Sequence, residues 1–600
     1  MSLTPLDDEF KGKFDPRVWR KLLQYLNGYR WAVARLALGG VTIAAVEAYL
    51  PIINGRMIDR AVTDGSLGAL GPLIALYVVL FAAFAACVFV FIKAAGELAT
   101  GVGFELRRDS FAKLQDLSFS FFDTRPVGWL TSRLTSDCGR VANILPWAIL
   151  DVFWGALLLT SVTIAMFVID WRLALWTCAI IPLLAAASVV FQRIMLHSSR
   201  QSRRTNSAMT ASFNEALLGV RTTKALVREE SNLAEFERLS SEMRRWMLKN
   251  AVQGSIYLPL VMTIGAVGAA IALARGGSDV LAGHGLSVGK LITFMQFAVL
   301  FQHPIQELAQ RFADIMNASS AAERVTSLLA TEPAIKDAAD PAGAAARIRE
   351  VRFEHVTFAY KPGVPVLHDF NLTVRDGETI ALVGATGGGK STIVSLTARF
   401  YEPTEGRILL DGVDYRERSL HWLQSNLGVI QQVPHLFSGT VRDNIRYGKL
   451  DATDSEIEAA ARQVNAHDMI GTLENGYGFQ VGECGDKLST GQRQLVALAR
   501  AVLRDPQVFI MDEATSSVDT ATERLIQAGI EAVLRDRIAF VIAHRLSTIR
   551  RASLIVVIDG GRIVEQGSHK QLIAKRGRYF ELYTHQYAAE REAALFETGA

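Results

Sequence analysis

The sequence predicts a multidomain protein in which an all-α polytopic membrane domain is followed by an α/β domain. The first observation is compositional: hydrophobic residues make up 50% of the 600 residues and charged residues only 20%, whereas typical soluble domains are about 25% charged. The second is the uneven distribution of this apolar excess. Long apolar runs recur in the first half of the chain, and short apolar runs bounded by loop patterns follow in the second half.

Six membrane-spanning helices are expected within residues 1–330. An apolar run of roughly 18 residues with few charges is long enough to cross the hydrocarbon. The last expected span is the weakest, and it is retained because an even number of spans returns the chain to its starting side. The expected spans are about 33–55, 70–95, 141–169, 172–195, 251–275 and 286–310.

Basic residues predict how these spans are oriented. They are concentrated in the segments Lys93–Arg140 and Arg193–Lys249, and loops rich in lysine and arginine stay in the cytoplasm. Both termini are therefore expected to be cytoplasmic, and the helices are expected to continue well into the cytosol. The segment Asp15–Tyr29 mixes basic with bulky apolar residues, which is typical of an interfacial amphipathic helix, with a plain soluble helix as the alternative.

A linker is expected at residues 331–349, where the composition becomes rich in alanine, aspartate and proline. Residues 350–600 then form the α/β domain, with Ile380–Val383, Val508–Met511 and Ile538–Ile542 as buried parallel strands. A net charge of +3 argues against a nucleic-acid partner. The four cysteines are too widely spaced for a metal site or a disulfide framework.

The segment Gly384–Ser391 reads GATGGGKS and fits the pattern of a phosphate-binding loop, GxxxxGK[ST]. It follows an expected strand and precedes a helical run, which is the context that this motif requires. Its glycines let backbone N–H groups surround a phosphate, and the helix N-terminus adds a favourable dipole. Lys390 is expected to pair with phosphate oxygens, and the Ser391 hydroxyl to ligate Mg²⁺.

The strand Val508–Met511 is followed by two carboxylates, Asp512 and Glu513. Capping a strand with acids is common, but together with an upstream phosphate loop the pair indicates nucleotide hydrolysis. Asp512 is expected to hold Mg²⁺, and Glu513 to orient or deprotonate the attacking water.

The segment Leu488–Gln492, LSTGQ, resembles the LSGGQ signature of the ABC family. The residues DEATSSVD (Asp512–Asp519) and AHRLST (Ala543–Thr548) fit the same family. The whole chain, membrane half first, resembles an ABC exporter half-transporter of the multidrug or lipid-exporter kind. The resemblance implies ATP-driven transport, most simply export by alternating access. Import on an exporter fold and a nucleotide-gated regulator that does not pump remain alternatives.

The resemblance assigns expected roles to individual residues. Tyr360 would stack on adenine, Gln432 would be the Q-loop glutamine, His544 the switch histidine and Asp519 the D-loop aspartate. Gln432 is preferred over Gln431 by its spacing to Leu436. The catalytic set is then Glu513, His544 and Gln432, and the Mg²⁺ set is Ser391, Gln432 and Asp512. The ATP-binding set is Tyr360, Gly384, Thr386, Gly387, Gly388, Gly389, Lys390, Ser391 and Thr392.

The resemblance also implies a dimer, because the signature residues of this family contact nucleotide on the other ATPase domain. Here these are Ser489, Thr490, Gly491 and Gln492. Two positions depart from the family pattern: Thr490 replaces a glycine, and Cys484 stands where an arginine is more usual. With Glu513 and His544 intact, this combination resembles one subunit of a heterodimeric exporter, and a homodimer is the alternative.

The transported substrate is poorly specified by the sequence. Glu47 is a charged residue within an expected span, which marks it as a functional candidate, with an interfacial or paired charge as the alternative. Gln296, Gln302 and His303 in the last span are expected to line a cavity for an amphipathic or small-molecule substrate. The segments Phe121–Gly128 and Phe213–Lys224 resemble the coupling regions of the family. A bacterial plasma membrane, with the ATPase domain cytoplasmic, is the expected location.

Overall fold

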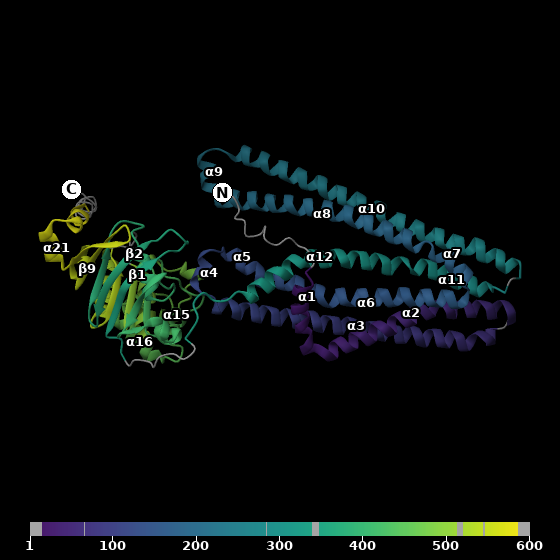
Figure 1. Cartoon of the computed structure of the whole chain (residues 1–600), viewed down its shortest axis with the longest axis horizontal. Coiled ribbons are helices and arrows are strands. Elements are labelled where there is room, and N and C mark those ends of the chain that lie inside the picture. The colour runs from purple at the N-terminus through teal and green to yellow at the C-terminus, as the bar shows by residue number, and fades with distance from the viewer. Residues whose placement is uncertain are drawn as a thin grey trace. The chain divides into compact units, whose positions relative to one another are not determined.

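A computed structural model describes residues 15–64, 67–283, 285–338, 347–512, 520–543 and 546–585. The chain divides into two compact units (Figure 1). The first comprises Met1–Asp116 and Arg125–Thr331, and the second comprises Leu117–Thr124 and Glu332–Ala600. The first unit is helical, whereas the second contains the sheets (Figure 1).

The first unit is built from long helices joined by short turns. Its elements are α1 (Pro16–Leu23), η2 (Gln24–Tyr29), α2 (Arg30–Asp64), α3 (Leu67–Asp116), α5 (Val127–Ser132), η3 (Arg133–Asp137), α6 (Cys138–Ile169), α7 (Trp171–Cys178), α8 (Ile181–Leu218), α9 (Val220–Ala225), α10 (Glu229–Leu281), α11 (Val288–Leu300) and α12 (Gln302–Ala330). The 53 residues of α10 extend for about 80 Å at 1.5 Å per residue. This helix is far longer than the roughly 30 Å hydrocarbon layer, so helical extensions beyond the membrane are confirmed.

Five helical stretches of the described chain are long and apolar enough to cross a membrane. They are Pro16–Val62, Leu70–Asp116, Val127–Ile169, Trp171–Leu218 and Glu229–Leu281. The sixth expected span, 286–310, falls on α11 and the beginning of α12, which are separated at Phe301. Leu291, Phe294 and Phe297 of α11 are buried in the same core as Leu158 of α6. The sixth segment therefore belongs to the bundle. Because it is interrupted at Phe301, neither α11 nor α12 alone is both long and apolar enough to be recognised as a span.

The N-terminal helix α1 begins where Asp15 caps it by accepting a hydrogen bond from the Arg17 N–H at 2.8 Å. Its apolar face packs on the bundle, where Leu22 lies in a core with Val102 and Val325. The interfacial position expected for this helix from its sequence stays a prediction. One side of the helix packs on α3, α6 and α12, since Leu22 is buried, whereas Leu23 is exposed.

A buried charge cluster joins α6 to α12. Asp137, at the end of the π-helical turn η3, is only 1% exposed. Its carboxylate accepts hydrogen bonds from Arg133 at 2.8 Å and from Arg324 at 2.9 and 2.6 Å. Buried carboxylates need such partners. The cluster therefore holds α6 and α12 in one defined position relative to each other.

The second unit contains a small antiparallel sheet and a larger, mostly parallel one. The strands are β1 (Glu350–Phe358), β2 (Leu367–Arg375), β3 (Thr379–Val383), β4 (Glu405–Leu410), β5 (Val413–Asp414), β6 (Leu427–Ile430), β7 (Val508–Asp512), β8 (Ile538–Ile542), β9 (Leu554–Asp559) and β10 (Arg562–Gly567). Their orders are β2-β1-β4-β5 and β10-β9-β3-β8-β7-β6. The three strands expected from the sequence, β3, β8 and β7, are parallel neighbours.

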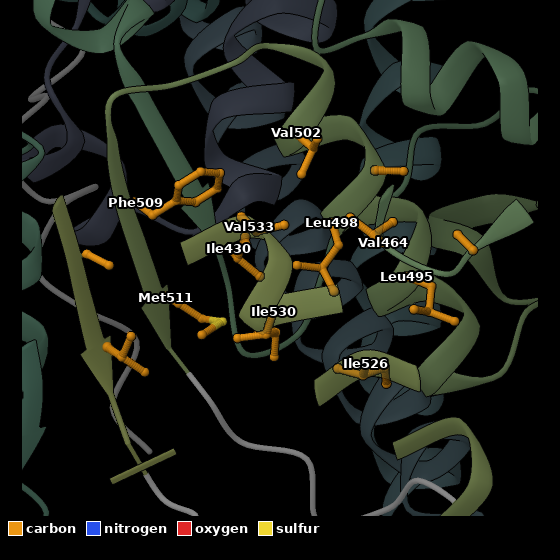
Figure 2. Close-up of a cluster of buried hydrophobic side chains, with 14 of the residues drawn as sticks. Ile430, Val464, Leu495, Leu498, Val502, Phe509, Met511, Ile526, Ile530 and Val533 are labelled. Atoms are coloured by element: carbon orange, nitrogen blue, oxygen red, sulfur yellow. The ribbon is translucent and has the colours of Figure 1, made fainter. Parts of the chain in front are cut away.

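Helices complete this unit. They are α4 (Phe119–Asp123), α13 (Lys390–Thr397), η4 (Tyr415–Glu417), α14 (Leu420–Ser425), α15 (Val441–Arg446), α16 (Asp454–Gln463), α17 (His467–Gly471), η5 (Gly476–Gly478), η6 (Glu483–Gly485), α18 (Thr490–Leu503), α19 (Thr520–Leu534), α20 (Leu546–Arg551) and α21 (His569–Lys575). Alternate side chains of a strand point to opposite faces, so β7 serves two cores. Phe509 and Met511 face the helices, where Leu498 of α18 and Ile530 of α19 meet them (Figure 2). Ile510 lies in the other core, with the antiparallel sheet.

Candidate nucleotide site and transmembrane cavity

The phosphate loop connects β3 to α13, and its backbone adopts φ angles that require glycine. Gly384, Gly387 and Gly389 have φ angles of 152°, 83° and 102°, which side chains rarely adopt. A side chain at Gly384 would also overlap the Ile558 carbonyl oxygen, and one at Gly389 would contact Leu367. The loop is therefore a tight cradle that larger residues would fill.

Lys390 is the first residue of α13, and its side chain curls back over the loop. Its Nζ donates hydrogen bonds to the carbonyl oxygens of Gly384 and Ala385, each at 2.8 Å. Burial lowers the pKa of Lys390, and the nearby Asp512 carboxylate partly offsets this effect. Gly389 caps α13 without a side-chain hydrogen bond, so backbone N–H groups at this helix end suit an anion. The Lys390 ammonium group, the N-terminus of α13 and the glycine-lined loop together suit the phosphates of a nucleotide.

The other expected ATP-binding residues surround this loop. Ser391 is exposed, and Thr392 is buried beside Tyr360, with 3.2 Å between their hydroxyl oxygens. The Tyr360 ring is 48% exposed and stands edge-on to Tyr401 at 5.0 Å. Thr386, Gly387 and Gly388 form the crest of the loop, where Thr386 and Gly387 are exposed. The structure thus brings an exposed aromatic ring next to the phosphate cradle.

Asp512 ends β7, next but one to β3 in the sheet. Because these strands are parallel, their carboxyl ends lie at one edge, where Asp512 pairs in register with Ile542. Glu513, Asp519 and His544 lie outside the described residues. In sequence, Glu513 directly follows β7, and His544 comes two residues after β8, so both follow strands that end at this edge.

The two candidate Q-loop glutamines occupy different surroundings. Gln431 and Asp512 line the same small cavity of about 20 Å³, which is enough for about one water molecule. Both glutamines are exposed in the loop that follows β6, and Gln432 is not among the residues that line this cavity. The choice of Gln432 as the Mg²⁺-sensing residue stays a prediction. Among the described residues no group of three His, Cys, Asp or Glu side chains could hold a metal.

The signature segment forms the start of α18. Ser489 caps this helix by a reciprocal capping box with Gln492, and Gly491 is buried. The Thr490 hydroxyl oxygen accepts a hydrogen bond from Arg493 at 3.2 Å. Arg493 also donates to the carbonyl oxygens of Gly485 and Leu488. Sequence reasoning missed Arg493, which lies one turn beyond Thr490 and ties this threonine to the preceding loop.

The first part of the first coupling segment, up to Thr124, belongs to the second unit. The Phe119 ring stacks on Phe400 with centroids 4.1 Å apart, and the Tyr401 hydroxyl donates a hydrogen bond to Asp123. Burial, with this bond, raises the pKa of Tyr401. Phe400 and Tyr401 lie a few residues after α13, so α4 contacts the region that follows the phosphate-loop helix. The second segment spans the end of α8 and α9.

A cavity of about 880 Å³ lies within the helical unit, and all four expected cavity residues line it: Glu47, Gln296, Gln302 and His303. The structure adds Asn54, Tyr77 and Gln306, which sequence reasoning missed. Asn54 lies two helical turns after Glu47, a spacing that could have revealed it. The Asn54 side chain donates a hydrogen bond to the Gln296 carbonyl oxygen at 3.2 Å, so polar groups of α2 and α11 converge in the cavity.

Comparisons with known proteins agree with this architecture. Residues 36–305 match the ABC transporter transmembrane region, and residues 367–516 match the ABC transporter family. An uncharacterized ABC transporter ATP-binding protein, YknV of Bacillus subtilis, is 33% identical over 96% of this chain and 95% of its own length. The ATP-dependent lipid A-core flippase of Syntrophus aciditrophicus is 36% identical over 81% of each chain.

A solved structure agrees with these sequence relatives. A bacterial Atm1-family ABC exporter with ATP bound superposes with a TM-score of 0.77 at 28% identity, covering 95% of this chain and 99% of the other. The chain therefore belongs to the ABC transporter family. It is an exporter-type half-transporter: an integral multi-pass membrane protein that binds nucleotide, hydrolyses ATP and works as a dimer. The alternatives of import and of a regulator that does not pump are not favoured.

Proposed function

We propose that this chain is one subunit of a heterodimeric, ATP-driven exporter of a bacterial plasma membrane, with both termini and the ATPase domain in the cytoplasm. The phosphate loop around Lys390 is the single observation that supports nucleotide binding most directly. The lysine ammonium and the N-terminus of α13 supply positive potential at one place. ATP is the nucleotide that such a transporter uses.

Each residue of the site has a part in this proposal. Tyr360 presents its exposed ring to adenine, and residues 384–392 hold the phosphates. Ser391, Gln432 and Asp512 would hold Mg²⁺, which when bound neutralises phosphate charge. Glu513 accepts a proton from the attacking water, and His544 contacts the terminal phosphate. The Asp519 segment and the signature residues Ser489 to Gln492 serve the dimer interface.

The heterodimer is proposed from Thr490. Its methyl group and its bond to Arg493 add bulk and fix the hydroxyl at a position where the family signature has glycine. A subunit with this signature and an intact Glu513 would supply catalytic carboxylate to one composite site and a weakened signature to the other. A partner half-transporter with an unaltered signature would complete the active site.

The substrate is proposed to be amphipathic. The cavity that contains Glu47, Gln296, Gln302 and His303 combines polar groups with apolar walls, as sites for drug-sized ligands do.

ATP hydrolysis by the chain purified alone in lipid nanodiscs tests the proposal, with Glu513→Gln as the control. We expect weak turnover from protein that binds ATP, and strong turnover after co-expression with a second half-transporter. Robust turnover of the isolated chain that Glu513→Gln abolishes would instead establish a self-sufficient homodimer. Absence of ATP binding would overturn the assignment of the site itself.

A further inference from the structure

The described residues that line the transmembrane cavity include one acid and one histidine. Of the described residues that line it, Glu47 carries the one carboxylate, and none is a lysine or arginine. Around it stand the amides of Asn54, Gln296, Gln302 and Gln306. The remaining wall is largely apolar, with Leu50, Leu258, Met262, Ile292, Met295 and Val299.

Glu47 lies in the middle of the first expected span and is half-buried. No ion pair in the described part of the chain joins it to a lysine or arginine, and His303 is the ionisable base close enough to interact with it. The His303 ring is exposed and stands edge-on to Trp154 at 5.8 Å. An ionised carboxylate at membrane depth is costly unless a cation or water meets it, so the cavity favours a positively charged occupant.

The amide groups are held by the packing of the helices. The Asn54 amide donates to Gln296 at 3.2 Å. The Gln302 amide lies directly against Gly265 of α10, where a side chain would overlap it. These contacts keep neutral hydrogen-bonding groups beside Glu47 without adding a competing charge. A volume of about 880 Å³ matches drug-sized ligands.

We propose that this cavity binds amphipathic cations, with the positive group next to Glu47 and the apolar body against α10 and α11. The inference rests on the proposed function in that it takes this cavity as the substrate site. It adds the chemical class of the substrate. Anionic amphipaths of the same shape are disfavoured because the carboxylate repels them and no lysine or arginine among the described wall residues compensates.

Tetraphenylphosphonium and tetraphenylborate test the proposal, because the two ions have nearly the same shape and opposite permanent charge. Equilibrium binding is measured without ATP, on the complex as isolated from the membrane and placed in nanodiscs. We expect the phosphonium to bind more tightly than the borate. The isosteric change Glu47→Gln should weaken phosphonium binding about tenfold, equivalent to about 1.4 kcal/mol, because the attraction between opposite charges is lost, and should leave borate binding unchanged or tighter.

Glu235→Gln is the matched control, because Glu235 is an exposed carboxylate on α10 outside the cavity. It should bind both ions as the unaltered protein does. Equal affinity of the unaltered protein for both ions, or unchanged phosphonium binding by Glu47→Gln, would overturn the inference, and the first outcome needs no variant to fold. Because the assay contains no ATP, its failure is distinct from a failure of ATP hydrolysis.

Discussion

Arg399 is a charged residue in the interior of the ATPase domain, with only 2% of its surface exposed. Its guanidinium donates to Glu402 at 2.9 Å and to the carbonyl oxygens of Tyr415 and Arg418 at 3.1 Å. It also donates to the Lys336 carbonyl oxygen at 3.2 Å. One side chain thus ties the segment before the domain to the end of the phosphate-loop helix.

Replacing Arg399 by methionine should destabilise the ATPase domain by about 3 kcal/mol, because several buried acceptors and Glu402 lose their donor. We expect the midpoint of thermal unfolding of the full chain to fall by about 6 °C or more. Arg399→Lys keeps the charge but not the fork of donors, and should have an intermediate effect. An unchanged midpoint for Arg399→Met would show that other groups hold this segment.

Thr490 is the residue on which the heterodimer proposal depends. Thr490→Gly restores the family signature and removes the hydroxyl that Arg493 binds. We expect ATP turnover by the isolated chain to rise about tenfold, as for a regained contact to the reacting phosphate. Thr490→Ser, which loses only the methyl group, is the matched control and should change turnover less. A lower rate in Thr490→Gly would mean that the threonine is the active form of this signature.

At the scale of elements, the helices α2 and α11 approach each other closely at Gly55 and Gly289. A side chain at Gly289 would overlap the Gly55 carbonyl oxygen and the Asp59 carboxylate. Asp59 accepts hydrogen bonds from the Ser287 hydroxyl at 2.6 Å and from the Gly289 N–H at 2.7 Å. The close approach sets the spacing of two helices that line the cavity.

Gly289→Ala should therefore force these helices apart, at a cost of about 1–3 kcal/mol typical of overpacking. The expected readout is a lower midpoint of thermal aggregation in detergent. Gly96→Ala is the control, because Gly96 lies in α3 with open space where a side chain would be. Equal stability of the two variants would contradict the close packing of α2 on α11.

Some of these elements could be predicted from patterns in the sequence, and others could not. The strands β3, β7 and β8 could be predicted because short apolar runs of branched residues are typical of buried parallel strands. The interruption at Phe301, between α11 and α12, lies just before Gln302, His303 and Pro304. A proline disturbs the helical turn that precedes it, so a kink here could be expected, but its exact position could not. The packing of α1 on the bundle could not be predicted from the sequence, because an amphipathic pattern fits a protein surface as well as a membrane surface.

For the whole molecule, Cys484 offers a native probe of topology. It is the one exposed cysteine, since Cys138 is buried and Cys87 and Cys178 are partly buried. A membrane-impermeant maleimide should label inside-out vesicles and not intact cells, if the ATPase domain is cytoplasmic. Cys484→Ser should abolish this labelling. Labelling of intact cells that Cys484→Ser removes would contradict the proposed orientation.

The sequence by itself determined the two-part architecture, the phosphate loop and the family, because hydropathy runs and motif spacing are local properties of the chain. It also indicated Glu47, Gln296, Gln302 and His303 as residues of one cavity. Only the tertiary structure decided that Asn54, Tyr77 and Gln306 line this cavity with them, and that Arg399 holds the Lys336 segment. Such convergence depends on how distant helices pack, which no local pattern encodes.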